Sequence, residues 1–248
     1  MHVDFSAGTA LVSALILVIA FFLRGMSGFG SGLLAVPLLA LYLPLTFVVP
    51  LMLVVDFTAA VTLGGSARSR IAWKEIASLL PFTASGLILG LFLLIRLPPA
   101  PLELVLGVFV IAFGLRNILG LHGSTPVSRM WAAPAGLLGG TIGSMFGTGG
   151  PPYVVYLSHR IHDKTKLRAT LSGLFVLDGG MRIISFLITG LLLQKRVWFA
   201  AIGALPLMGL GLYAGHRAHL RMSHAQLLRL IGALLLISGT SLLWKALR

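Results

Sequence analysis

The chain has 248 residues, of which 57% are apolar and only 10% are charged, and its mean hydropathy is +1.00. These values exclude an ordinary soluble domain, because a bilayer core about 30 Å thick takes roughly 20 apolar residues per helical span and such segments fill the chain. The formal net charge of +13 does not indicate a nucleic-acid partner, since the basic residues cluster in short stretches between apolar segments, as in cytoplasmic loops. We therefore expect an all-α polytopic membrane protein.

The first half of the chain, residues 1–119, contains five apolar segments. They are Ala10–Leu23, Ser31–Leu43, Thr46–Gly64, Ile76–Ile95 and Leu102–Leu119. The second of these would extend only about 20 Å as a helix, so it does not easily cross the hydrocarbon alone. The N-terminus lacks the basic region of a cleaved signal peptide, and the first segment is therefore expected to be a mature membrane segment.

A polar linker, residues 120–130, leads to a second half, residues 131–248, with five further segments. They are Trp131–Met145, Pro151–Ser158, Leu167–Leu193, Val197–Ala214 and Ala225–Leu243. The second segment is again short, at about 12 Å of helix. Short segments broken by glycine and proline at matching places in two halves indicate a transporter with a binding site near the bilayer midplane. Whether the short segments are re-entrant or fully spanning stays open.

The two halves resemble one another in sequence. At an offset of 125 residues, Trp73, Pro81, Gly86, Gly90, Gly107 and Gly114 fall on Trp198, Pro206, Gly211, Gly215, Gly232 and Gly239. At an offset of 122, Val54-Val55-Asp56 falls on Val176-Leu177-Asp178, and at 119, Gly28-Phe29-Gly30 falls on Gly147-Thr148-Gly149. We infer a duplication with two small length changes.

The charge of the loops predicts the orientation. If residues 66–73 are cytoplasmic and the sides then alternate, twelve Lys and Arg residues lie inside and five outside, as the positive-inside rule requires. This assignment places both termini outside and gives each half an odd number of crossings. The two halves are therefore predicted to be inverted repeats.

The glycine motifs are the candidate substrate site. Glycine lets the backbone leave helical geometry, and the N-terminus of the helix that follows presents free N–H groups and a positive dipole end, which favour an anion. Ser144 is a further hydroxyl donor in the second motif. The alternative is that these glycines only permit tight helix packing, as expected at Gly86/Gly90 and Gly211/Gly215. The candidate substrate-binding residues are Arg24, Ser27, Gly28, Gly30, Ser31, Gly147, Thr148, Gly149, Gly150 and Arg182.

Four charged residues lie within apolar segments or at a break, where an unpaired charge is costly, so a functional role is the first hypothesis. Asp178 and Arg182 are four residues apart and can pair on one helix face, either to position helices or with Arg182 free to act on substrate. Asp56 has no basic residue at helical spacing and must meet Arg24, a hydrogen-bond donor or a proton. Asp56 and Asp178 are thus candidates for coupling or for structural charge.

Other kinds of chemistry have little support. The chain has no cysteine, and neither a Walker loop nor an HExxH motif nor a nucleotide fingerprint occurs. The histidine pairs His159/His162 and His216/His219 fall in predicted cytoplasmic loops, where a basic membrane-surface role is favoured over a metal site. We expect no enzyme, no cofactor and no metal.

These motifs make the sequence resemble the sulfite exporter TauE/SafE family, also called the 4-toluene sulfonate uptake permeases. The resemblance rests on Gly28–Gly32 followed by Pro37, on Gly147–Pro152, and on Leu167–Leu171 ahead of Asp178 and Arg182. It implies a bacterial or archaeal inner-membrane carrier of sulfite, thiosulfate, sulfate or organic sulfonates. Many relatives carry an amide where this chain has Asp178, so the resemblance assigns no coupling role there.

The leading hypothesis is a secondary carrier for a small sulfur oxyanion or organosulfonate, working by alternating access of the two repeats within the lipid bilayer. The alternatives are a carrier or channel for another small anion, and a membrane scaffold subunit that transports nothing and docks a partner through the basic loop His159–Arg168. Protons as the coupling ion and a homodimer are left open.

Overall fold

The computed structural model describes residues 7–27, 30–64, 68–120, 127–218 and 224–247, and in this part of the chain every regular element is helical. The first half forms α1 (Ala7–Ser27), α2 (Ser31–Ala40), α3 (Leu45–Gly64), α4 (Trp73–Arg96) and α5 (Pro99–Ile118). The second half forms α6 (Ala132–Phe146), α7 (Gly150–Arg160), α8 (Lys164–Ile188), α9 (Lys195–Ala218) and α10 (His224–Ala246). Three 3₁₀ turns are η1 (Arg68–Arg70), η2 (Arg129–Trp131) and η3 (Leu191–Leu193).

The lengths of the helices confirm the expected polytopic membrane protein. Within the described residues, six helices are long and apolar enough to cross a membrane, namely α1, α3, α4, α5, α8 and α9. By contrast, α2 has 10 residues and α7 has 11, so the second element of each half is short, as the sequence predicts. Most helices are longer than their apolar segments, because polar and charged residues at the ends continue the helical backbone.

The prediction of one segment from Leu167 to Leu193 is wrong at its C-terminal end. The helix α8 ends at Ile188, and Gly190 adopts a left-handed conformation with φ 81° before η3 begins. Glycine takes positive φ at low cost and commonly ends helices in this way. Hydropathy alone does not reveal this boundary, since the apolar run continues through Leu191-Leu192-Leu193.

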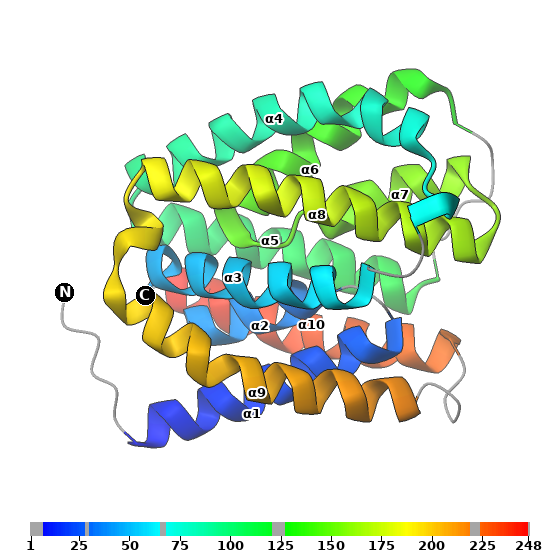
Figure 1. Cartoon of the computed structure of the whole chain (residues 1–248). Coiled ribbons are helices and arrows are strands. Elements are labelled where there is room, and N and C mark those ends of the chain that lie inside the picture. The colour runs from blue at the N-terminus through cyan, green and yellow to red at the C-terminus, as the bar shows by residue number, and fades with distance from the viewer. Residues whose placement is uncertain (1–6, 28–29, 65–67, 121–126, 219–223, 248) are drawn as a thin grey trace.

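The long helices pack in pairs drawn from different halves. Figure 1 shows α4 with α6 at the top of the molecule and α1 with α9 at the bottom, while α5 packs on α10 and α3 on α8. The N-terminal end of α1 and the C-terminal end of α10 lie on the same side, at the left of Figure 1. By their order within the two halves, α1 corresponds to α6 and α4 to α9. The pair α1/α9 is therefore the counterpart of the pair α6/α4.

Glycines allow the close approach within these outer pairs. A Cβ atom on Gly86 would collide with the carbonyl oxygen of Leu137, and one on Gly211 would lie 2.7 Å from the carbonyl oxygen of Val18. Gly90 and Gly215 are equally crowded by the backbone of the facing helix. The packing role predicted for the Gly86/Gly90 and Gly211/Gly215 pairs is therefore confirmed, and the small-residue spacing brings two backbones into contact.

Candidate functional site

A small cavity lies where α2 and α7 begin, and we call it the central cavity. Its volume is about 60 Å³, which is room for a few water molecules or one small oxyanion. Of the ten candidate substrate-binding residues and the two aspartates, ten residues from both halves of the chain line it. They are Arg24, Gly30, Ser31, Asp56, Gly147, Thr148, Gly149, Gly150, Asp178 and Arg182. The remaining two are Gly28, which lies outside the described residues, and Ser27, whose side chain is not described.

The two glycine breaks touch one another. Gly30 and Gly147 have φ of 96° and 66°, so both occupy the left-handed region that only glycine adopts easily. A Cβ atom on Gly32 would lie 2.6 Å from the carbonyl oxygen of Gly147 and 3.3 Å from Asp56 Oδ2. The start of α2 is therefore pressed against the break before α7, and the sequence did not single out Gly32 for this contact.

Both short helices begin without a side-chain cap, at Gly30 for α2 and at Gly149 for α7. Pro151 and Pro152 follow at the start of α7 and carry no N–H, so the donors left at this end are those of the preceding residues. Within the described part of the chain, the N–H groups of Thr148, Gly149 and Gly150 donate to no other residue. Unpaired N–H groups beside a cavity are donors for an anion.

On the α3 side of the cavity, Asp56 binds an arginine and a serine. Arg24 Nη1 lies 2.5 Å from Asp56 Oδ1 and 3.0 Å from Ser31 Oγ, and Nη2 donates to the backbone oxygen of Asp56 at 3.2 Å. The Ser31 hydroxyl donates to Asp56 Oδ1. Of the three partners considered for Asp56, the structure therefore has both Arg24 and a hydroxyl donor.

On the α8 side, Asp178 and Arg182 pair along one helix, at 2.9 Å between Oδ2 and Nη2. Arg182 Nη1 also donates to the carbonyl oxygen of Gly143 on α6, at 2.8 Å, and the Tyr153 hydroxyl lies 3.4 Å from Asp178 Oδ1. The sequence analysis did not predict this contact of Tyr153, which directly follows Pro151-Pro152 in the second glycine motif. Both faces thus carry a neutral pair of opposite charges.

The two arginines do not occupy equivalent positions in the repeat. By the offset of 119, Arg24 falls on Gly143, and by the offset of 122, Arg182 falls on Ala60. The arginine that links the first and third helices therefore comes from the first helix in one half and from the third helix in the other. In the first half an arginine on α1 reaches an aspartate on α3, and in the second half an arginine on α8 reaches a carbonyl oxygen on α6.

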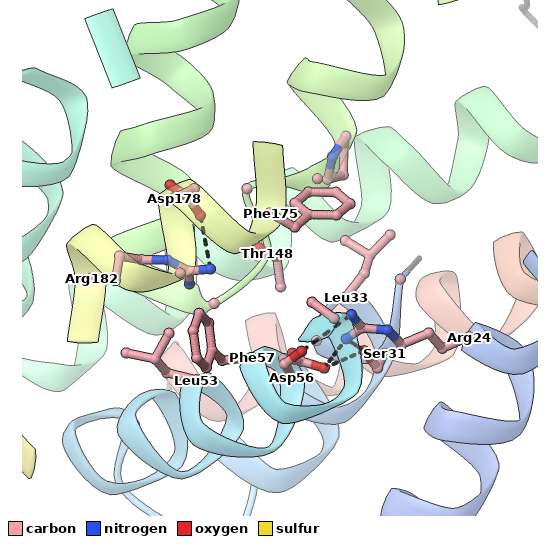
Figure 2. Close-up of a pocket in the computed structure, with 18 residues that line it drawn as sticks. Arg24, Ser31, Leu33, Leu53, Asp56, Phe57, Thr148, Phe175, Asp178 and Arg182 are labelled. Atoms are coloured by element: carbon pink, nitrogen blue, oxygen red, sulfur yellow. Dashed lines mark hydrogen bonds and ion pairs between the residues drawn. The ribbon is translucent and has the colours of Figure 1, made fainter. Parts of the chain in front are cut away.

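Three buried polar atoms at the cavity have no partner. They are Arg24 Nε, Arg182 Nε and Thr148 Oγ1, and all three residues line the cavity and are at most 8% exposed. Figure 2 shows Thr148 between the two ion pairs. An unpaired polar atom in such surroundings costs free energy, so a ligand that pairs with it is favoured.

Ser144 does not belong to this site. Its hydroxyl donates to the carbonyl oxygens of Gly140 and Leu87 and joins α6 to α4. The sequence suggested this hydroxyl as a ligand donor, but it is bound to the backbone and does not line the central cavity, so we do not propose it as part of the site. In the described residues no group of three His, Asp or Glu side chains could hold a metal ion.

Two phenylalanines complete the cavity, and the sequence analysis missed both. Phe57 and Phe175 line it from α3 and α8, one residue after Asp56 and three before Asp178. A Cβ atom on Gly179 would lie 2.8 Å from Phe57 Cδ2. Phe57 and Gly179 are counterparts at the offset of 122. An alignment of the two halves around Asp56 and Asp178 could therefore have drawn attention to this contact.

The family model described as "Sulfite exporter TauE/SafE" matches residues 13–242, which is nearly the whole chain. The chain belongs to this family. A curated relative of this TauE/SafE chain, "Probable inner membrane transporter protein TsaS" from Comamonas testosteroni, is 27% identical over 201 residues, covering 79% of this chain and 83% of the relative. No solved structure matches the chain. The TauE/SafE chain is a membrane transporter and not an enzyme, as the sequence predicted.

Proposed function

We propose that this TauE/SafE protein is a secondary carrier for a small sulfur-containing anion of the sulfite, sulfate, thiosulfate or sulfonate class, and that the central cavity is its substrate site. The description of the family as sulfite exporters supports this choice. The relative is described as an inner-membrane transporter, and we infer the same membrane for this chain. The assignment to sulfur anions therefore rests on membership of the family, whereas the assignment of the site rests on the geometry of the central cavity.

The observation that carries the proposal is the convergence of donors on one small cavity. The free N–H groups before α7, the unpaired Thr148 hydroxyl and the unpaired Nε atoms of Arg24 and Arg182 all belong to residues that line it. An oxyanion accepts several hydrogen bonds at once, and hydrogen bonds to a charged acceptor are the strong ones. A cavity of about 60 Å³ fits one sulfite or the sulfonate head of a larger molecule.

The two ion pairs determine the net charge of the cavity walls. With both pairs intact the cavity walls are neutral, so an incoming anion adds uncompensated charge. A coupling cation that enters with the substrate balances this charge and favours passage through a region of low dielectric constant, and Asp56 and Asp178 are the carboxylates beside which it would lie.

The arrangement of helices supports alternating access of two inverted repeats. The counterpart pairs α1/α9 and α4/α6 flank the molecule, and α3 and α8, which carry the two aspartates, meet between them. In this arrangement one repeat moves against the other around a fixed central site. The loop charges orient the molecule with both termini outside.

Net flux of labelled sulfite into proteoliposomes that contain only this protein tests the function. A scaffold subunit gives no flux, and a carrier for another small anion gives flux of that anion but not of sulfite. In purified protein, Arg24→Lys and Arg182→Lys are each expected to weaken sulfite binding, because an ammonium group cannot replace the planar fork of a guanidinium.

The matched control for these variants is Arg96→Lys, an exposed arginine at the C-terminal end of α4. It is expected to bind sulfite as the wild type does. Wild-type affinity in both Arg24→Lys and Arg182→Lys would instead leave these arginines as structural partners of Asp56 and Asp178.

A further inference from the structure

A second cavity lies at the end of the molecule where α4 begins, at the right of Figure 1, and we call it the basic cavity. Its volume is about 870 Å³, and its walls come from η1, η2 and the ends of α4, α7 and α8. It shares no lining residue with the central cavity. The transport mechanism proposed above makes no use of it.

The lining of the basic cavity has an excess of positive charge. Five Lys and Arg residues face two acids, which leaves three positive charges with His162 neutral. The basic residues are Arg70, Lys74, Arg129, Arg160 and Lys166, and the acids are Glu75 and Asp163. These residues come from three separate stretches of the chain, 70–75, 129 and 160–166, which the fold brings together.

The two acids are already engaged by other groups. Buried Glu75 accepts hydrogen bonds from Arg160 at 3.0 Å, from the Tyr156 hydroxyl at 3.0 Å and from Arg129 at 3.3 Å. Asp163 caps α8 by accepting the N–H of Lys166 at 2.6 Å. Glu75 therefore fixes the walls of the cavity, because it joins α4 to α7 and η2.

Three basic side chains remain uncompensated. Within the described residues, no carboxylate pairs with the side chain of Arg70, Lys74 or Lys166, and all three are exposed. In addition, α4 starts in this cavity without a side-chain cap at Ala72, so the positive end of its dipole adds to the field. The cavity therefore favours an anion with more than one charged oxygen.

Exposed aromatic and apolar side chains in the lining and next to it in sequence indicate that this anion belongs to a lipid. Trp73 lines the cavity and is 54% exposed, and Trp131, two residues beyond Arg129, is 61% exposed. Tryptophan concentrates at the level of the lipid headgroups. Met130, between Arg129 and Trp131, is exposed as well, so apolar surface for an acyl chain lies beside the basic side chains.

We propose that the basic cavity binds the phosphate headgroup of an anionic phospholipid from the surrounding leaflet. Arg70, Lys74 and Lys166 neutralise the phosphate, while the exposed tryptophans lie against the glycerol and the upper acyl chain. Basic cavities between membrane helices bind anionic headgroups in this way.

The experiment uses the full-length protein in a neutral detergent and does not depend on transport. Phosphatidylglycerol, phosphatidylcholine with the same acyl chains, and inorganic phosphate are titrated, with binding followed by native mass spectrometry and by the midpoint of thermal unfolding. Phosphatidylglycerol is expected to bind and raise the midpoint, whereas phosphatidylcholine and inorganic phosphate at equal concentrations do not.

The test variant is Arg70→Gln/Lys74→Gln/Lys166→Gln, which changes only exposed side chains without a carboxylate partner. At about 1 kcal/mol per basic residue near a membrane surface, its affinity for phosphatidylglycerol is expected to fall by about 100-fold. The control Arg96→Gln/Lys195→Gln/Arg196→Gln removes the same charge at the opposite end and is expected to bind as the wild type does.

Equal loss of phosphatidylglycerol affinity in both triple variants would indicate unspecific attraction and overturn the proposal. No loss of affinity in the test variant would overturn it as well. Binding of inorganic phosphate as tightly as phosphatidylglycerol would assign the cavity to a soluble phosphate instead of a lipid. If the triple variant does not fold, as judged from its unfolding midpoint without lipid, Lys74→Gln alone is measured, with Lys195→Gln as its control and about a fivefold loss expected.

Discussion

The substitution Thr148→Val removes one hydroxyl group from the central cavity and keeps the shape of the side chain. Thr148 is 3% exposed, and its Oγ1 atom has no hydrogen-bond partner. The substitution therefore breaks no hydrogen bond within the protein. The variant therefore tests substrate binding separately from folding. Substitution of a residue whose polar atoms are already paired would change both at once.

The magnitude follows from the chemistry of the lost donor. A hydrogen bond to a charged group contributes about 1.5–3 kcal/mol, so the dissociation constant for an anionic substrate is expected to rise by about 10- to 150-fold. The folded protein without substrate is expected to keep its stability or gain slightly, since a buried unpaired hydroxyl is itself unfavourable.

The assay is a sulfite titration of purified protein together with thermal unfolding in detergent. The matched control is Thr170→Val, because the buried Thr170 hydroxyl accepts the N–H of Ala72 at 3.0 Å and donates to the carbonyl oxygen of Lys166 at 2.7 Å. This control is expected to lose about 1–3 kcal/mol of stability and to retain its affinity for sulfite.

The two variants should therefore show opposite patterns. If Thr148→Val lowered the unfolding midpoint as Thr170→Val does and bound sulfite with wild-type affinity, the hydroxyl would have a structural role, and the reasoning from its missing partner would be refuted.

Three further predictions concern packing, topology and backbone conformation. On α9, Gly215→Ala is expected to cost about 1–3 kcal/mol because its Cβ meets the α1 backbone, whereas Gly209→Ala, with nothing within 4 Å, should stabilise the helix by up to about 1 kcal/mol; equal unfolding midpoints in detergent would contradict the packing argument. Because the native chain has no cysteine, single cysteines at Ser69 and Gln194 can be probed with an impermeant reagent, and labelling of Ser69→Cys from outside with protection of Gln194→Cys would reverse the proposed orientation. Gly147→Val forces a branched residue to φ 66° and is expected to abolish sulfite uptake while the protein stays in the membrane; unchanged affinity would return this glycine to a packing role.

Composition was enough to predict the helical membrane fold, since apolar length is a local property of a sequence. Ten of the residues chosen from the glycine breaks and from the intramembrane charges line one cavity, and their role in substrate binding stays a prediction. The partners within the site were only partly predictable. Pairing of Asp178 with Arg182 follows from helical spacing. The link from Asp56 to Arg24 and Ser31, in contrast, joins α3 to α1 and α2, and contacts between separate helices cannot be read from a single sequence. Contacts through backbone, such as the approach of Gly32 to Gly147, leave no side-chain signal at all.

The opposite placement of the two arginines makes the halves of this transporter chemically unequal. In an alternating-access cycle between two identical inverted repeats, the inward-facing and outward-facing states would have the same energy in a symmetric bilayer. Here α1 is tied to α3 through an ion pair between two side chains, whereas α6 is tied to α8 through a hydrogen bond from a side chain to a peptide carbonyl. Separation of the helices therefore costs a different free energy in each half. Under the alternating access that we propose, the inward-facing and outward-facing states then differ in energy even in a symmetric bilayer.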